Sequence, residues 1–224
     1  MTIREFTKTY GDRTVLQFPG MELDPGTIYA VIGPNGCGKS TLAKVLAGAE
    51  KPDGKERVLD LSSGDSLGYS PQKNYPFQLS VERNLLLATG DTPAARERAD
   101  AYLDALGMTG LRGKKASRLS GGETAKLAMA RVMMEDCALL ILDEPTAAMD
   151  IQSTLAAEQL ILDYRARTRA AVLLITHSLA QALRISDQTL FLAGGCLLES
   201  GPSEQVLRHP QHEQTKSFIE FYGL

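Results

Sequence analysis

The chain has 224 residues, of which 43% are hydrophobic and 23% are charged, so it can form one globular domain with a buried core. Its formal net charge of −3 argues against a nucleic-acid partner held on a broad basic surface. The three cysteines lie far apart with no C-x-x-C pair, so neither a disulfide framework nor a zinc site is predicted. This cysteine usage is typical of a reducing compartment.

The N-terminal stretch MTIREFTKTYGDRT carries charged residues where a signal peptide needs an apolar run. No segment approaches the roughly 20 apolar residues that a membrane-spanning helix needs. We therefore expect the chain to be cytoplasmic.

Four short apolar segments predict strands, at residues 27–32, 67–70, 138–142 and 171–176. Three of them are continuously apolar, which is typical of strands that are buried on both faces of a parallel sheet. They alternate with amphipathic helices. The sequence therefore predicts an α/β fold with a mostly parallel sheet.

Residues 73–118 carry helical patterns and no convincing strand. One predicted helix begins after the N-cap Thr92, with Pro93 at its first position, and stops at Gly107. We expect a single domain over 1–224, with a core formed by 1–72 and 119–224 and an inserted helical subdomain at about 73–118.

The stretch GPNGCGKST, at residues 33–41, follows the first predicted strand and precedes a predicted helix. It fits the phosphate-loop pattern G-x-x-x-x-G-K-[ST], in which backbone amides cradle phosphates, Lys39 reaches the β/γ oxygens and Ser40 ligates Mg²⁺. The alternative is a plain surface turn. The predicted nucleotide-binding residues of this loop are Gly33, Pro34, Asn35, Gly36, Cys37, Gly38, Lys39, Ser40 and Thr41.

The stretch LLILDEP, at residues 139–145, is an apolar strand that ends in two carboxylates. Side chains alternate along a strand, so the two acids point in different directions. Asp143 is predicted to hold the metal, and Glu144 to polarise an attacking water as general base. The alternative is a solvated turn after the strand.

Two further polar residues follow predicted strands. Gln72 follows the strand at 67–70 and His177 follows the strand at 171–176. Ligands of open α/β sheets bind outside the carboxyl ends of the strands, so these side chains should gather with Asp143 and the phosphate loop at one edge. We expect His177 to contact the γ-phosphate, although a lone histidine is more often structural.

The stretch LSGGE, at residues 119–123, predicts a capping box in which Ser120 and Glu123 start a helix. That structural role explains both residues completely. A capping box does not require Gly121 and Gly122. These glycines have poor helix propensity, and they have no side chains to cover the backbone amides at the start of the helix. The chain therefore contains a second helix start that could bind an anion.

The ordered set GPNGCGKST, Gln72, LSGGE, LLILDEP, AAMD (147–150) and His177 resembles the nucleotide-binding subunit of ABC transporters over essentially the whole chain. The resemblance implies a P-loop NTPase (RecA-like) core with an N-terminal antiparallel β portion. It also implies a head-to-tail homodimer, or a pair of ATPase subunits, that sandwiches two ATP molecules. In that dimer the partner's ATP would be contacted by Ser120, Gly121, Gly122 and Glu123.

By the same resemblance, Asp150 belongs to a loop at the dimer interface, and Gln72 contacts Mg²⁺ and senses the γ-phosphate. Tyr10 matches an aromatic residue that stacks on adenine, although an exposed tyrosine in a turn needs no ligand. Two positions depart from the family pattern. Glu123 replaces a commoner Gln, and AAMD replaces the usual Ser and Leu before Asp150.

The implied function is ATP hydrolysis, with Glu144, Lys39, His177 and Gln72 as catalytic residues, coupled to dimer closure and opening. Transport requires an integral membrane permease, which would hold the chain at the inner face of the cell membrane. The expected docking surface lies around Gln72 and residues 74–84, where exposed apolar side chains could otherwise just pack the subdomain onto the core.

The segment at 209–221 resembles the tail of importer ATPases that serve polar amino acids or small oxyanions such as tungstate, molybdate or phosphate. An importer of that type would also use an extracytoplasmic solute-binding protein. Two alternatives stay open at this point: a soluble ABC ATPase of the iron–sulfur assembly type, and a P-loop kinase.

Overall fold

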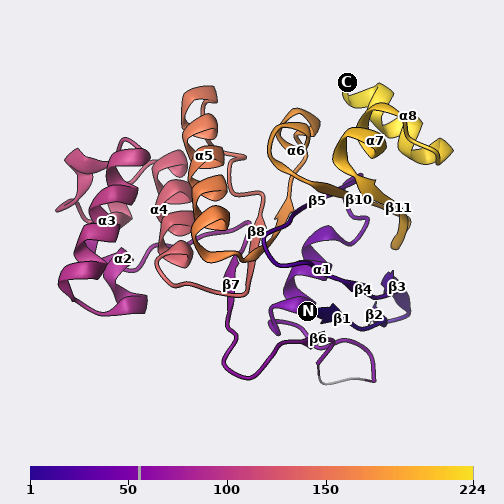
Figure 1. Cartoon of the computed structure of the whole chain (residues 1–224), viewed down its shortest axis with the longest axis horizontal. Coiled ribbons are helices and arrows are strands. Elements are labelled where there is room, and N and C mark those ends of the chain that lie inside the picture. The colour runs from indigo at the N-terminus through magenta and orange to yellow at the C-terminus, as the bar shows by residue number, and fades with distance from the viewer. Residues whose placement is uncertain (55–56, 224) are drawn as a thin grey trace.

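The computed structural model describes residues 1–54 and 57–223 (Figure 1). The strands are β1 Thr2–Ile3, β2 Phe6–Tyr10, β3 Arg13–Phe18, β4 Met21–Glu22, β5 Ile28–Ile32, β6 Leu59–Asp60, β7 Leu67–Ser70, β8 Leu139–Asp143, β9 Ala171–Ile175, β10 Gln188–Ala193 and β11 Cys196–Pro202. The α-helices are α1 Lys39–Leu46, α2 Val81–Thr89, α3 Pro93–Ala105, α4 Gly121–Met133, α5 Ile151–Thr168, α6 Leu179–Ile185, α7 Ser203–Arg208 and α8 Glu213–Tyr222. Short 3₁₀ turns occupy Thr109–Leu111 and Ala116–Arg118.

The larger sheet has eight strands within the described ranges, in the order β2-β3-β11-β10-β5-β9-β8-β7. Its part from β10 to β7 is parallel, and β5, β8 and β9 are buried along their full length. The predicted mostly parallel α/β sheet is therefore confirmed. Because β5, β7, β8 and β9 run in the same direction, their carboxyl ends meet at one edge of the sheet.

Side chains alternate between the two faces of each central strand, and each face is covered by different helices. On one face, Tyr29 and Val31 of β5 pack with residues of α1. On the other face, Ile28 packs in the cluster that contains α2 to α5, and Ala30 packs with α6, α7 and α8. This double coverage explains why these strands are apolar at every position.

An antiparallel β portion at the N-terminus is confirmed. β2 and β3 form a hairpin in the larger sheet, and β1 pairs with β4 and β6 in a small antiparallel sheet. The hairpin of β10 and β11 was not predicted from the sequence. It lies between β5 and β3 and joins the N-terminal strands to the parallel strands.

Residues 73–118 form α2, α3 and the two 3₁₀ turns, and they lie at one end of the molecule in Figure 1. Thr92 caps α3 by accepting a hydrogen bond from the Ala95 amide at 3.1 Å, and Pro93 stands at its first position, as the sequence predicted. α4 packs against both α2 and β7, so it connects these helices to the sheet.

Cys37, Cys137 and Cys196 are all free thiols, in agreement with the sequence. Of the helices in residues 1–54 and 57–223, none is both long enough and apolar enough to cross a bilayer.

Candidate functional site

The loop between β5 and α1 depends on glycines whose conformation or surroundings exclude a side chain. Gly33 has φ of 144°, and a Cβ there would lie 2.0 Å from the carbonyl oxygen of Leu192. Gly38, which precedes α1, has φ of 109°, and its Cβ would lie 3.1 Å from the Val15 carbonyl oxygen. The glycines therefore let the loop pass close to two neighbouring strands.

Lys39 is the first residue of α1 and is only 5% exposed. Its Nζ donates hydrogen bonds to the carbonyl oxygens of Gly33 at 2.7 Å and Pro34 at 3.0 Å. Burial lowers the pKa of Lys39. A partly desolvated ammonium whose hydrogen bonds go to neutral carbonyls fits a phosphate ligand, because an anion would compensate the charge.

Ser40 and Asp143 meet across the sheet edge. The Ser40 hydroxyl donates a hydrogen bond to Oδ1 of Asp143 at 3.2 Å, and burial raises the pKa of this carboxyl. A hydroxyl beside a buried carboxylate supplies the oxygen ligands that Mg²⁺ prefers. These residues fit the metal predicted from the sequence.

Glu144 lies between Gln72 and His177. Its Oε2 accepts a hydrogen bond from Nε2 of Gln72 at 2.8 Å, and its Oε1 lies 2.6 Å from Nε2 of His177. The Glu144 backbone has φ of 51°, a left-handed conformation that is strained for a non-glycine residue. The predicted gathering of these side chains at one edge of the sheet is therefore present in the structure.

One pocket of about 220 Å³ unites this edge with the phosphate loop. Predicted residues make up all of its lining except Val15, and the lining consists of Val15, Asn35, Gly36, Gly38, Lys39, Ser40, Thr41, Gln72, Glu144 and His177. Val15 was missed because an apolar residue on β3 gives no sequence signal for a ligand site. The fold alone brings β3 beside the loop.

Cys37 lies inside the phosphate loop and is 4% exposed. Its Sγ is 3.9 Å from Nζ of Lys39, and burial raises the pKa of the thiol. The small side chain thus fills space under the loop, beside the lysine.

Tyr10 does not line the phosphate pocket. It stands at the end of β2 with 45% of its surface exposed, and Nζ of Lys8 lies 4.8 Å from the centre of its ring. Stacking of Tyr10 on adenine stays a prediction.

The predicted capping box of α4 is present. The Glu123 amide donates to Oγ of Ser120 at 3.2 Å, and the Ser120 amide donates to Oε2 of Glu123 at 2.7 Å. This second hydrogen bond lowers the pKa of Glu123. A Cβ on Gly122 would lie 2.8 Å from the carbonyl oxygen of Ala148, so Gly122 has a packing role that the sequence did not indicate.

The residues 120–123 do not line the phosphate pocket of their own chain. Gly121 instead lines a neighbouring groove with Gln72, Glu144 and Ala148. Asp150 caps α5, with its Oδ1 accepting a hydrogen bond from the Ser153 amide at 2.7 Å. Asp150 therefore has a role within its own chain.

A glycine-rich loop between a buried strand and a helix, with a buried lysine and an adjacent hydroxyl–carboxylate pair, defines the chain as a P-loop nucleotide-binding protein. The family model described as ABC transporter matches residues 16–147. The chain therefore belongs to the ABC transporter family of ATP-binding domains, and it is an ATPase.

The chain is similar to several curated proteins named for import. It is 34% identical to a probable anion import ATP-binding protein of Haloferax volcanii, with 98% of this chain and 86% of that protein covered. It is 39% identical to the zinc import ATP-binding protein ZnuC of Paracoccus denitrificans, over 86% and 75%. It is 35% identical to the tungstate uptake system ATP-binding protein TupC of Peptoclostridium acidaminophilum, over 87% and 95%.

Solved structures share the fold. An ATP-binding subunit of an ABC transporter superposes with a TM-score of 0.82 at 23% identity, covering 99% of this chain and 98% of that one. RNase-L inhibitor superposes with a TM-score of 0.80 at 25% identity, covering 99% and 42%. The family assignment sets the kinase alternative aside, and the import relatives do not favour the iron–sulfur assembly alternative.

Proposed function

We propose that this chain hydrolyses ATP to drive the import of a small oxyanion through a membrane permease. The observation that carries the catalytic part is the placement of Glu144 beside the phosphate pocket that holds Lys39. The relatives named for anion import and tungstate uptake support the cargo.

In this mechanism Glu144 is the general base for the attacking water, and Lys39 and His177 contact the phosphates. Both carboxylate oxygens of Glu144 are engaged, one by Gln72 and one by His177. A water molecule needs one of these oxygens as its acceptor. Each carboxylate oxygen can accept a second hydrogen bond, so Glu144 can accept the attacking water beside its contacts with Gln72 and His177.

Ser40, Asp143 and Gln72 are the proposed Mg²⁺ ligands, directly or through water. The metal would neutralise charge on the phosphate oxygens when it is bound. The buried carboxyl of Asp143, already in contact with the Ser40 hydroxyl, supports this assignment.

We further propose that two copies, or two paired ATPase subunits, enclose two ATP molecules. Residues 120–123 lie outside the phosphate pocket of their own chain. In a head-to-tail pair, Ser120 and Gly121 would face the partner's ATP, and Asp150 would stand at the interface. The amides at the start of α4 would then serve as the second anion site.

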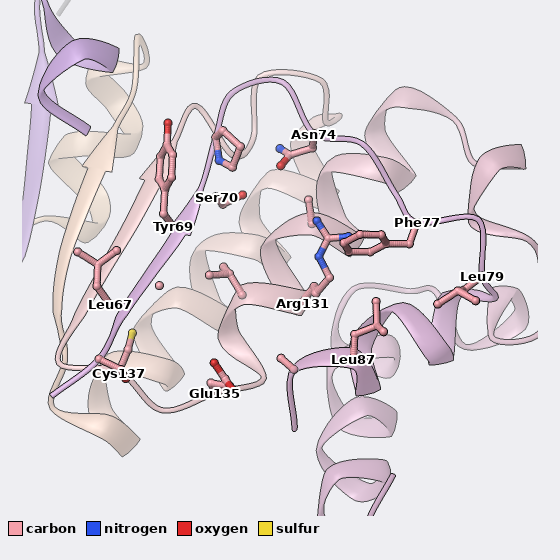
Figure 2. A pocket seen from close by; sticks show the side chains of 16 residues that line it. Leu67, Tyr69, Ser70, Asn74, Phe77, Leu79, Leu87, Arg131, Glu135 and Cys137 are labelled. Atoms are coloured by element: carbon pink, nitrogen blue, oxygen red, sulfur yellow. The ribbon is translucent and has the colours of Figure 1, made fainter. Parts of the chain in front are cut away.

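The permease is proposed to dock in a groove of about 460 Å³ formed by β7, the loop after it, α2 and α4 (Figure 2). Phe77 and Leu87 line it and are 54% and 50% exposed. The Phe77 ring lies over Arg131, whose guanidinium carbon is 4.9 Å from the ring centre. No carboxylate in the described part of the chain pairs with Arg131, which favours a permease helix with an apolar face and an acidic residue.

A permease partner would keep the chain at the inner face of the membrane, and an extracytoplasmic binding protein would deliver the cargo. Zinc is the second candidate cargo, because the zinc import protein of Paracoccus denitrificans is 39% identical to this chain. The cargo does not contact the proposed ATP site, so its identity must be tested on the whole system.

The test has two stages. A tagged chain is extracted from native membranes in mild detergent, with Phe77→Asp as the docking variant and Glu97→Gln, on the exposed surface of α3, as its matched control. We expect a permease to co-purify with the native chain and with the control but not with Phe77→Asp. A soluble partner in its place would contradict transport.

The purified complex is then placed in lipid vesicles with its binding protein. ATP hydrolysis is measured with tungstate, molybdate, phosphate, sulfate or Zn²⁺ on the binding-protein side. Stimulation by an oxyanion supports the proposal, and stimulation by Zn²⁺ alone supports the second candidate.

A further inference from the structure

A buried polar array lies behind the catalytic edge and does not belong to the phosphate pocket. Its centre is Glu158 on α5, which is 3% exposed. Arg184 on α6 donates to both of its oxygens, from Nε to Oε2 at 2.9 Å and from Nη2 to Oε1 at 2.6 Å. This bidentate ion pair compensates the buried carboxylate.

Gln181 on the first turn of α6 extends the array to the loop that follows β8. Its side chain is fully buried. Nε2 of Gln181 donates to Oε1 of Glu158 at 3.2 Å and to Oγ1 of Thr146 at 3.1 Å. Because an ionised carboxylate only accepts hydrogen bonds, Glu158 fixes the orientation of the Gln181 amide. The amide is thereby held against the Thr146 hydroxyl.

The two ends of this connection belong to the two catalytic segments. Thr146 stands two residues after Glu144, and the amide of Ala147 donates to the Glu144 carbonyl oxygen at 3.3 Å. Gln181 stands four residues after His177, in a helix that begins at Leu179. The segment after β8 and the segment after β9 are therefore joined twice, once through Glu144 and His177 and once through Thr146 and Gln181.

The second connection differs from the first in one respect. Under the proposed function, Glu144, Gln72 and His177 all line the pocket that receives the nucleotide, so their contacts can rearrange when ATP and the attacking water bind. The contact between Thr146 and Gln181 involves no group that meets the nucleotide pocket. It can therefore stay in place if the contact between Glu144 and His177 rearranges.

We propose that Gln181 and Thr146 are positioning residues that hold Glu144 beside His177 when Glu144 accepts the attacking water. This inference rests on the proposed role of Glu144. Neither residue touches ATP, so the effect of losing the contact should appear in kcat and not in ATP binding.

Thr146→Val removes the hydroxyl with little change of shape. We expect kcat for ATP hydrolysis to fall about five- to tenfold, since the part-buried hydrogen bonding of Thr146 to Gln181 is lost, with KM and the Kd for ATP unchanged. Thr146→Ser keeps a hydroxyl and should regain most of the lost rate. Gln181→Leu should lower kcat to a similar extent. An unchanged kcat in Thr146→Val would overturn the inference.

The matched control is Thr168→Val, which removes a half-buried hydroxyl that donates to the Tyr164 carbonyl oxygen at the far end of α5. It should lower Tm and leave kcat unchanged. If Thr168→Val lowers kcat as much as Thr146→Val does, the effect is general destabilisation and the inference fails.

The double variant Thr146→Val with Gln181→Leu should be no slower than Gln181→Leu alone, because both changes remove the contact between these two residues and only Gln181→Leu also removes the hydrogen bond to Glu158. If the fold-losses in kcat of the two single variants multiply in the double variant, the two residues do not act through a shared contact and the inference fails. Glu144→Gln separates the two proposals. If Glu144→Gln is inactive while Thr146→Val keeps the native kcat, only the positioning role of Thr146 and Gln181 fails. If Glu144→Gln is fully active, both that role and the proposed general-base role of Glu144 are overturned.

Discussion

Oε1 of Glu144 lies 2.6 Å from Nε2 of His177, so the proposed general base and the proposed γ-phosphate contact are in direct contact. The two residues follow neighbouring parallel strands, β8 and β9, whose register places Asp143 opposite Ile175. The Glu144 amide also donates to the Ile175 carbonyl oxygen at 3.0 Å. The sheet itself therefore sets the spacing of this pair.

Glu144→Gln keeps the size of the side chain and removes its basicity. We expect kcat to fall by about 100-fold or more, as for loss of a general base, while ATP still binds because Lys39 and the loop amides are intact. Single-turnover hydrolysis and an ATP-binding titration on the same sample check this. Glu97→Gln, on exposed α3, should behave as the native chain, and turnover by Glu144→Gln near the native rate would contradict the assignment.

Glu123→Gln should strengthen the ATP-bound dimer modestly, by about two- to fivefold in dissociation constant. Glutamine preserves the capping box and removes a negative charge that would face the partner's triphosphate. Lys114, 3.8 Å from Glu123, already offsets part of that charge, which keeps the effect small. The dissociation constant of the dimer is measured by sedimentation with ATP, in a Glu144→Gln background with and without Glu123→Gln. Equal dimerisation with and without Glu123→Gln would contradict this effect of charge.

Cys37 should react slowly with alkylating reagents, because it is buried and burial raises the pKa of its thiol. Bound ATP should slow the reaction further, and the alkylated protein should no longer bind nucleotide. Peptide mass spectrometry over time, with and without ATP, follows each site separately. Cys196, on β11 and outside the phosphate pocket, is the internal control whose rate should not depend on ATP. A Cys37 rate that ATP leaves unchanged would mean that phosphate does not cover the thiol.

As the pH is lowered, Mg²⁺ binding should weaken at a higher pH than it would if Asp143 were an ordinary, solvated aspartate. Burial raises the pKa of Asp143, so this carboxyl takes up a proton at a higher pH than a solvated one and then loses its value as a ligand. Mg²⁺-dependent ATP affinity should be retained above the raised pKa and should fall as pH drops through it. Asp143→Asn should bind Mg²⁺ weakly and lose this step of the pH profile. An identical acid step in Asp143→Asn would assign the titration to another group.

Most of the phosphate site could be predicted from the sequence because its parts are local. A glycine-rich loop after an apolar strand, the pair Asp143 and Glu144 at a strand end, and the capping box of Ser120 each occupy a few consecutive residues. Their backbone requirements can therefore be recognised without knowing the fold. Residues 55, 56 and 224 lie outside the described structure and carried no predicted site.

Other features depend on contacts between distant segments, for which the sequence has no signal. The β10–β11 hairpin, the entry of Val15 into the pocket and the approach of Gly122 to Ala148 are examples. The array of Glu158, Arg184 and Gln181 is another, because a polar residue on a helix is ordinarily solvated.

The sequence by itself determined the parallel α/β core, the phosphate loop and the residues at the carboxyl edge, since strand period and turn chemistry act over short distances. Only the tertiary structure decided which of these side chains touch. It paired Glu144 with His177 and Gln72, left Tyr10 outside the pocket and buried Glu158 against Arg184. The physical reason is that such contacts depend on strand register and helix packing, which the whole core fixes at once.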